Sequence, residues 1–108
     1  MGASLGEFET LVLLALLHLG EDAYGITVRD EIARRTRRRP SLGTVYKALI
    51  RLEAKGLIRG RFGEPTPERG GRRKKHYRVL AGGRRALAQT MATLGQMAAG
   101  LDLAREVR

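Results

Sequence analysis

The sequence predicts a mostly helical domain with one small β-hairpin (an α+β fold), in the order helix, helix, helix, strand, strand, helix. Four stretches carry apolar residues at the spacing of an amphipathic or buried helix. Two shorter stretches alternate between apolar and polar residues, on either side of a segment rich in Gly and Pro. The chain has 108 residues, 43% of them hydrophobic, which is enough for one domain with one modest core.

The first two helices are predicted over residues 5–19 and 22–36. Ser4 and Glu7 have the spacing of a capping box at the start of the first helix, and Gly20 ends it. Apolar residues cover nearly all sides of this helix, which predicts burial on two sides. In so small a protein, a second subunit is the simplest cover for the second side. The residues of this helix predicted at a dimer interface are Leu11 and Leu14.

The third helix is predicted to run to about Lys55, with Ser41 as its N-cap and Gly56 just beyond its end. One side is apolar at helical spacing and is predicted to be buried; it consists of Leu42, Val45, Leu49 and Leu52. The opposite side is basic at its ends and small in the middle; it consists of Thr44, Lys47, Ala48, Arg51 and Lys55.

The hairpin is predicted from residues 57–63 and 74–80, and the charged connection over residues 63–73 is predicted to be a long basic loop. The last helix is predicted over residues 83–107. Its apolar residues follow the 4-3-4-3 spacing of a short coiled-coil seam: Leu87, Met91, Leu94, Ala98 and Leu101. Such a stripe would be exposed on a monomer, so we expect it to pack on a second copy. The predicted interface residues of this helix are Leu87, Met91, Leu94 and Leu101.

The charge of the chain is strongly positive and unevenly distributed. Lys and Arg number 21 against 11 Asp and Glu, for a formal net charge of +10. All of these bases lie in residues 29–108, whereas residues 1–28 hold four acids and no base. Two clusters hold most of the bases. The first arginine cluster is Arg34, Arg35, Arg37, Arg38 and Arg39; the second basic cluster is Arg69, Arg72, Arg73, Lys74, Lys75 and Arg78. This pattern favours a polyanionic partner, first nucleic acid and second an anionic membrane surface.

Several classes of protein are excluded by composition. The chain has no Cys, and its two His residues show no metal-ligand spacing, so we expect no metal, no cofactor and no thiol chemistry. Paired carboxylates near a His and a phosphate-cradling glycine loop are also missing from the sequence, which argues against an enzyme and leaves no catalytic residue to name. The longest apolar run has seven residues, against about 20 for a membrane helix. We therefore expect a soluble cytoplasmic protein.

The order of elements and the charge map together indicate a winged helix-turn-helix over residues 1–82, followed by a C-terminal dimerisation helix over residues 83–108. The third helix would enter the major groove of duplex DNA, and the hairpin would be the wing. Expected groove residues are Thr44, Lys47 and Arg51, whereas Ser41 is chiefly a cap whose helix N-terminus can also bind a phosphate. The other expected phosphate contacts are Arg37, Arg38, Arg39, Arg72, Arg73, Lys74 and Lys75. Replacing Lys47 or Arg51 by Ala should reduce specific binding more than nonspecific binding. The alternative is a small basic RNA-binding or ribosome-associated protein, although two Phe, three Tyr and no Trp offer few stacking platforms.

The sequence resembles the PadR family of bacterial transcriptional regulators over about residues 5–87. The stretch from Leu42 to Ile58 is very similar to the recognition helix of that family and its run into the wing. The pair Tyr24-Gly25, the basic and aromatic residues 71–77 and Gly83 also match. The sequence departs from the family pattern at four positions: Lys47 stands where Pro is usual, Phe62 near a usual Trp, His76 at a usual Tyr and Leu80 at a usual Thr.

The resemblance implies a homodimeric repressor, and a dimer should bind a pseudo-palindromic operator. The resemblance also implies that a small molecule weakens DNA binding; the alternative is a purely architectural repressor that responds to no ligand. The resemblance further implies that the dimer forms through the last helix and the first, and that the effector binds near this interface. It also implies that Tyr46 contacts the DNA backbone, although a tyrosine there could equally pack against the wing, and both could hold.

Overall fold

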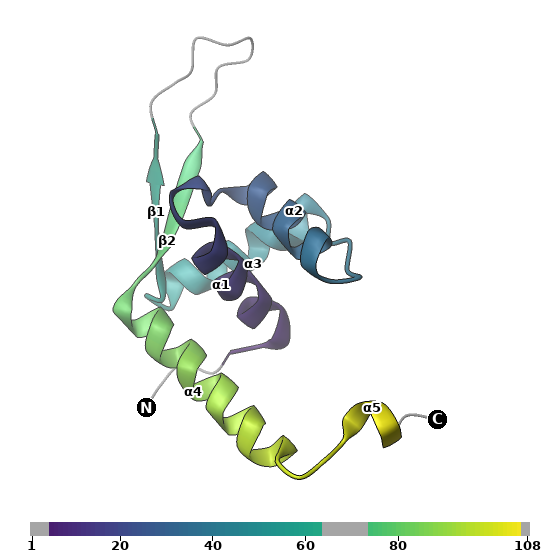
Figure 1. Ribbon diagram of the computed structural model, residues 1–108. Helices are drawn as coiled ribbons and strands as arrows, with labels where there is room; N and C mark the ends of the chain where they lie inside the picture. Colours follow the sequence, from purple (N-terminus) through teal and green to yellow (C-terminus); the bar gives the residue numbers. More distant parts are fainter. Residues whose placement is uncertain (1–4, 64–73, 107–108) are drawn as a thin grey trace.

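The computed structural model describes residues 5–63 and 74–106 and confirms the predicted fold class (Figure 1). Three helices form a small body beside a two-stranded antiparallel hairpin, and a longer helix leads away from it. The elements are α1 (Glu7–Leu19), the 3-10 turn η1 (Gly20–Asp22), α2 (Gly25–Arg35), α3 (Leu42–Ala54), β1 (Ile58–Phe62), β2 (Lys75–Val79), α4 (Ala81–Ala98) and the short α5 (Leu103–Glu106). No described helix is long and apolar enough to cross a membrane.

The first two helices begin later than the sequence predicts. The N-cap of α1 is Gly6, whose N–H donates to Glu9 Oε1 at 2.9 Å, so the predicted cap at Ser4 is wrong; Ser4 itself lies outside the described residues. Residues 20–22 form η1, so α2 begins at Gly25 rather than at residue 22. The Tyr24 N–H donates to Thr27 Oγ1 at 3.0 Å, and this bond stabilises the start of α2 at Gly25.

The third helix has the predicted ends. Ser41 Oγ accepts from the Thr44 N–H at 3.1 Å, which satisfies one of the free donors of the first turn. Gly56 has a φ of 75°, a left-handed conformation that favours glycine just past a helix end. The core lies where α1, α2, α3 and the hairpin meet. Its fully buried large side chains are Val12, Leu13, Val28, Val45, Leu49, Leu52 and Ile58.

The hairpin pairs Ile58 with Val79 at one end and Phe62 with Lys75 at the other. A backbone bond from the Tyr77 N–H to the Ala23 carbonyl at 2.8 Å joins β2 to the segment between η1 and α2. The wing is therefore tied to the helical body along its second strand. The predicted basic loop falls mostly on residues 64–73, outside the described part of the chain.

The last helix is shorter than the predicted span of residues 83–107. It starts at Ala81 and ends at Ala98, and Gly100 has a φ of 85°, which breaks the helix before α5. At its start, a Cβ on Gly83 would lie 2.3 Å from the Leu57 carbonyl oxygen, so glycine is needed for α4 to approach the core. Beyond its first turns, α4 extends away from the body (Figure 1).

Candidate nucleic-acid interface

The free face of α3 is centred on Lys47 and Ile50. Both side chains are exposed, Ile50 at 65%, and the neighbouring positions on this face are Gly43 and Ala54. Ala48, which the sequence analysis put on the exposed side, is completely buried, so that assignment is wrong. The helix is rolled so that Val45, Ala48, Leu49 and Leu52 form its buried side. The face open to a partner is therefore less basic than predicted.

Arg51 lies toward α1. Its Nε is 3.6 Å from Glu9 Oε2, and Lys55 Nζ is 2.9 Å from each oxygen of the same carboxylate. Burial raises the pKa of Glu9, but the Gly6 N–H and the two cations outweigh it, and the net result is a pKa below the ordinary 4.5. Glu9 thus fixes the last turns of α3 against the start of α1. Arg51 remains 54% exposed in its side chain, at the edge of the free face rather than at its centre.

Tyr46 packs on α2 and is partly exposed, whereas the sequence left open packing on the wing and contact with the DNA backbone; both of these roles stay predictions. Its ring packs on the start of α2, where a Cβ on Gly25 would come within 2.5 Å of Tyr46 Cε1. It is still 42% exposed, beside the free face of α3. Ser41 and Thr44 are exposed at the start of the helix, and their hydroxyl oxygens lie 2.9 Å apart. A phosphate approaching this helix N-terminus would meet both hydroxyls.

The first arginine cluster is largely engaged within the chain. Arg34 and Arg35 pair with Glu31, and Arg38 pairs with Glu7 of α1. The Arg35 and Arg34 guanidinium groups lower the pKa of Glu31. Arg39 donates to the Ala33 carbonyl at 3.0 Å. In the described part of the chain, Arg37 forms no ion pair or side-chain hydrogen bond, and it is exposed.

A carboxylate of α3 holds the wing in place. Glu53 accepts from the Gly60 N–H at 3.0 Å and from Lys75 Nζ at 3.1 Å, and these two bonds hold its pKa below the usual range. Lys75 also lies over the rings of Phe62 and Tyr77, whose phenol pKa is raised mainly by burial. Lys75 therefore links the wing to α3, and its contact with a phosphate stays a prediction. Lys74 is exposed, with Nζ 4.7 Å from the centre of the Tyr24 ring. Arg72 and Arg73 lie outside the described residues.

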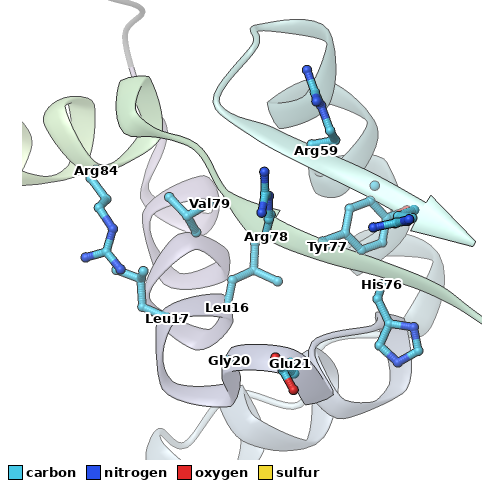
Figure 2. Close-up of a pocket in the computed structure, with 12 residues that line it drawn as sticks. Leu16, Leu17, Gly20, Glu21, Arg59, His76, Tyr77, Arg78, Val79 and Arg84 are labelled. Atoms are coloured by element: carbon cyan, nitrogen blue, oxygen red, sulfur yellow. The ribbon is translucent and has the colours of Figure 1, made fainter. Parts of the chain in front are cut away.

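The outer face of the hairpin carries cations that the predicted site omits. Because side chains alternate along a strand, Arg59 and Arg61 of β1 share one face with His76 and Arg78 of β2. An open groove of about 700 Å³ runs along this strand pair, bounded by the end of α1, η1 and Arg84 of α4 (Figure 2). The alternation of side chains along the two strands is visible in the sequence and could have placed these four residues on one face.

The predicted dimer residues divide into two groups. Met91, Leu94 and Leu101 are exposed, as is Met97, which the prediction omits. Leu87 is only 6% exposed and belongs to the core of its own chain, so it has little surface left for a partner. In α1, Leu11 and Leu14 are half-buried and pack on the edge of that core.

A free helix face beside a hairpin rich in arginine defines a winged helix-turn-helix DNA-binding protein. The family model of the transcriptional regulator PadR-like family matches residues 13–89, and the chain belongs to this family. Its members regulate transcription by binding DNA and are not enzymes.

Solved structures of PadR family regulators, and of other DNA-binding regulators, are similar to this chain in fold. A PadR family regulator from Eggerthella lenta is 28% identical, with a TM-score of 0.69 and coverage of 94% of this chain and 88% of that one. A transcriptional regulator from Clostridium thermocellum is 24% identical, with a TM-score of 0.73 and coverage of 93% and 89%. BpsR of Bordetella bronchiseptica is 22% identical, with a TM-score of 0.64 and coverage of 94% and 70%. Comparison with curated proteins gives no match.

Proposed function

We propose that this chain is a sequence-specific, homodimeric transcriptional repressor whose α3 enters the major groove of a pseudo-palindromic operator. The observation that carries the proposal is the free face of α3, which presents Lys47 and Ile50 while Glu53 holds the wing beside it. A major groove about 12 Å wide admits a helix in this position. Ser41, Thr44, Tyr46 and the exposed arginines would then meet phosphates on either side.

The dimer in this proposal uses the exposed part of α4. Met91, Leu94 and Met97 of α4 have exposed apolar side chains, as does Leu101 beyond its end. This helix extends away from the body (Figure 1). An exposed apolar surface of this kind is stabilised when a second copy covers it. Two copies related by a twofold axis would place their α3 helices on half-sites about 34–36 Å apart, one turn of DNA.

The proposal includes release from DNA by a small molecule. We place this ligand in the groove along the hairpin rather than at the dimer interface that the resemblance implies, because the groove has the size of a ligand site, about 300–1,000 Å³. A ligand there would touch both wing strands and the end of α1 at once (Figure 2). It would therefore favour one position of the wing relative to the helical body. The structure of BpsR, which shares the fold, concerns regulation of DNA binding by 6-hydroxynicotinic acid.

The test is selection of bound duplexes from a random pool with the full chain. We expect enrichment of a pseudo-palindrome and a steep loss of affinity with salt, because several phosphates are neutralised in each dimer. Failure to enrich any duplex sequence, or equal affinity for structured RNA, would contradict the proposal. Addition of candidate ligands to the same selection tests release.

The dimer is tested by sedimentation of two matched variants. Leu94→Glu places a charge in the exposed apolar surface of α4 and should give monomers. Ala92→Glu adds the same charge at another exposed position of this helix and should leave the dimer intact. Dimers in both variants would show that subunits meet elsewhere.

A further inference from the structure

Ile50 is an apolar side chain at the centre of the surface that faces DNA in the proposed function. Isolated exposed apolar residues are common on proteins, so position decides what this one means. Ile50 is 65% exposed and is absent from the hydrophobic core cluster and from the side chains packed against it. Its neighbours on the free face are Lys47, one turn earlier, and Ala54, one turn later.

The chemistry of the major groove leaves Ile50 one favourable contact. The base edges there present hydrogen-bond donors and acceptors, and the C5-methyl group of thymine is the apolar group among them. An isoleucine pressed on a guanine, cytosine or adenine edge removes water from a polar atom and returns no hydrogen bond, which is unfavourable. Over a thymine methyl, the same side chain buries apolar surface instead.

The local structure holds Ile50 in a fixed direction. A β-branched side chain in a helix strongly prefers one rotamer about its first torsion. On its buried side α3 is anchored by Leu49 and Leu52, which are completely buried, and its last turns are fixed by the ion pairs of Glu9. A rigid apolar group on a rigid helix can discriminate between bases, because it cannot move aside from a polar edge.

We propose that Ile50 is a specificity-determining residue, which contacts the C5-methyl group of one thymine in each half-site beside the base pair met by Lys47. The inference rests on the proposed insertion of α3 into the major groove. Lys47 and Ile50 are three residues apart, about 4.5 Å along the helix, so their base pairs lie within about two steps of each other.

The experiment replaces each thymine of the selected duplex, one position at a time in both half-sites, by deoxyuridine. This exchange removes the methyl group and leaves the base pairing unchanged. Affinity is measured by fluorescence anisotropy for the full wild-type chain, for Ile50→Ala and for a matched control, Ile26→Ala. Ile26 is also an exposed isoleucine on a helix, but it lies on α2.

We expect one thymine position at which deoxyuridine weakens wild-type binding about fourfold per half-site, the value of one buried methyl group. At that position the exchange should leave the affinity of Ile50→Ala unchanged, whereas Ile26→Ala should respond like the wild type. A fresh selection with Ile50→Ala should lose its preference at that base pair alone. Ile50→Val, which keeps the branch, should retain most of it.

Two results would overturn the inference. If the wild type selects a sequence but every thymine exchange affects wild type and Ile50→Ala alike, Ile50 contacts no methyl group, and the proposed function still stands. If the wild type selects no sequence, the proposed function fails and the inference fails with it. Thermal unfolding of both alanine variants near the wild-type midpoint confirms that exposed side chains were removed without loss of the fold.

Discussion

The clearest quantitative prediction compares Lys47→Ala with Arg51→Ala. Lys47 is exposed at the centre of the free face of α3, so in the proposed complex its loss would remove a base contact worth about 1–3 kcal/mol, or about 5- to 150-fold in specific affinity. Arg51 lies at the edge beside Glu9, whose carboxylate keeps Lys55 and the Gly6 N–H when the arginine is removed. We expect Arg51→Ala to weaken specific and nonspecific binding by the same factor.

The assay is titration of both variants against the selected operator and a scrambled duplex over a series of salt concentrations. For Arg51→Ala the ratio of the two affinities should stay at the wild-type value, and the salt slope should fall by about 0.9 if one phosphate contact is lost. For Lys47→Ala the ratio should fall. Equal loss of specificity in both variants would refute the orientation of α3 and would favour the face that the sequence pattern predicted.

Two glycine substitutions, with a third as a control, test contacts that only the structure reveals. Gly83→Ala forces a Cβ against the Leu57 carbonyl oxygen and should destabilise the fold by about 1–3 kcal/mol in thermal or urea unfolding. Gly82→Ala meets its neighbours at ordinary distances and should be neutral or stabilising by up to about 1 kcal/mol; equal loss in both would contradict the predicted contact. Gly25→Ala should push the Tyr46 ring off α2 and lower DNA affinity about tenfold, the value of one hydrogen bond to a phosphate, and unchanged affinity would show that the ring makes no such contact.

The sequence predicted those parts of the fold that local chemistry determines. Ser41 caps α3 because its hydroxyl can bond the Thr44 N–H, and Gly56 ends it because glycine tolerates a positive φ. The strands followed from alternation. These signals lie within a few residues of the feature that they specify, so a single sequence contains them.

The orientation of α3 could not be predicted in the same way. Ala48 and Ile50 differ by two positions, and hydropathy alone would expose the smaller residue and bury the larger one. The structure does the opposite, since Ala48 lies in the close contact of α3 with the core. The partners of Arg38, Arg51 and Lys75 were also hidden, because each ion pair joins residues 22 or more positions apart in the chain. Tertiary packing therefore decides which cations of a basic cluster remain available to DNA.

The buried carboxylate of Glu9 gives this packing a measurable pH dependence. Because its pKa is lowered in the folded chain, Glu9 contributes stability that is fully present above the ordinary 4.5 and is lost as the pH falls through the folded value. The pKa values of Glu31 and Glu53 are lowered as well. In acid the chain should therefore lose the stabilising contacts of several carboxylates together.

Glu9→Gln isolates the contribution of the Glu9 ion pairs to the free energy of unfolding. Glutamine can still accept from the Gly6 N–H, but Lys55 and Arg51 lose their charged partner, so we expect a loss of about 1–3 kcal/mol at pH 7. The difference from wild type should shrink at acid pH, as the pH falls through the lowered pKa of Glu9 and the carboxylate itself becomes protonated. Urea unfolding at the two pH values measures it, with Glu21→Gln as a control, since Glu21 is exposed and has no ion pair within the described residues. An equal loss at both pH values would mean that the shape rather than the charge of the side chain at residue 9 holds α1 against α3.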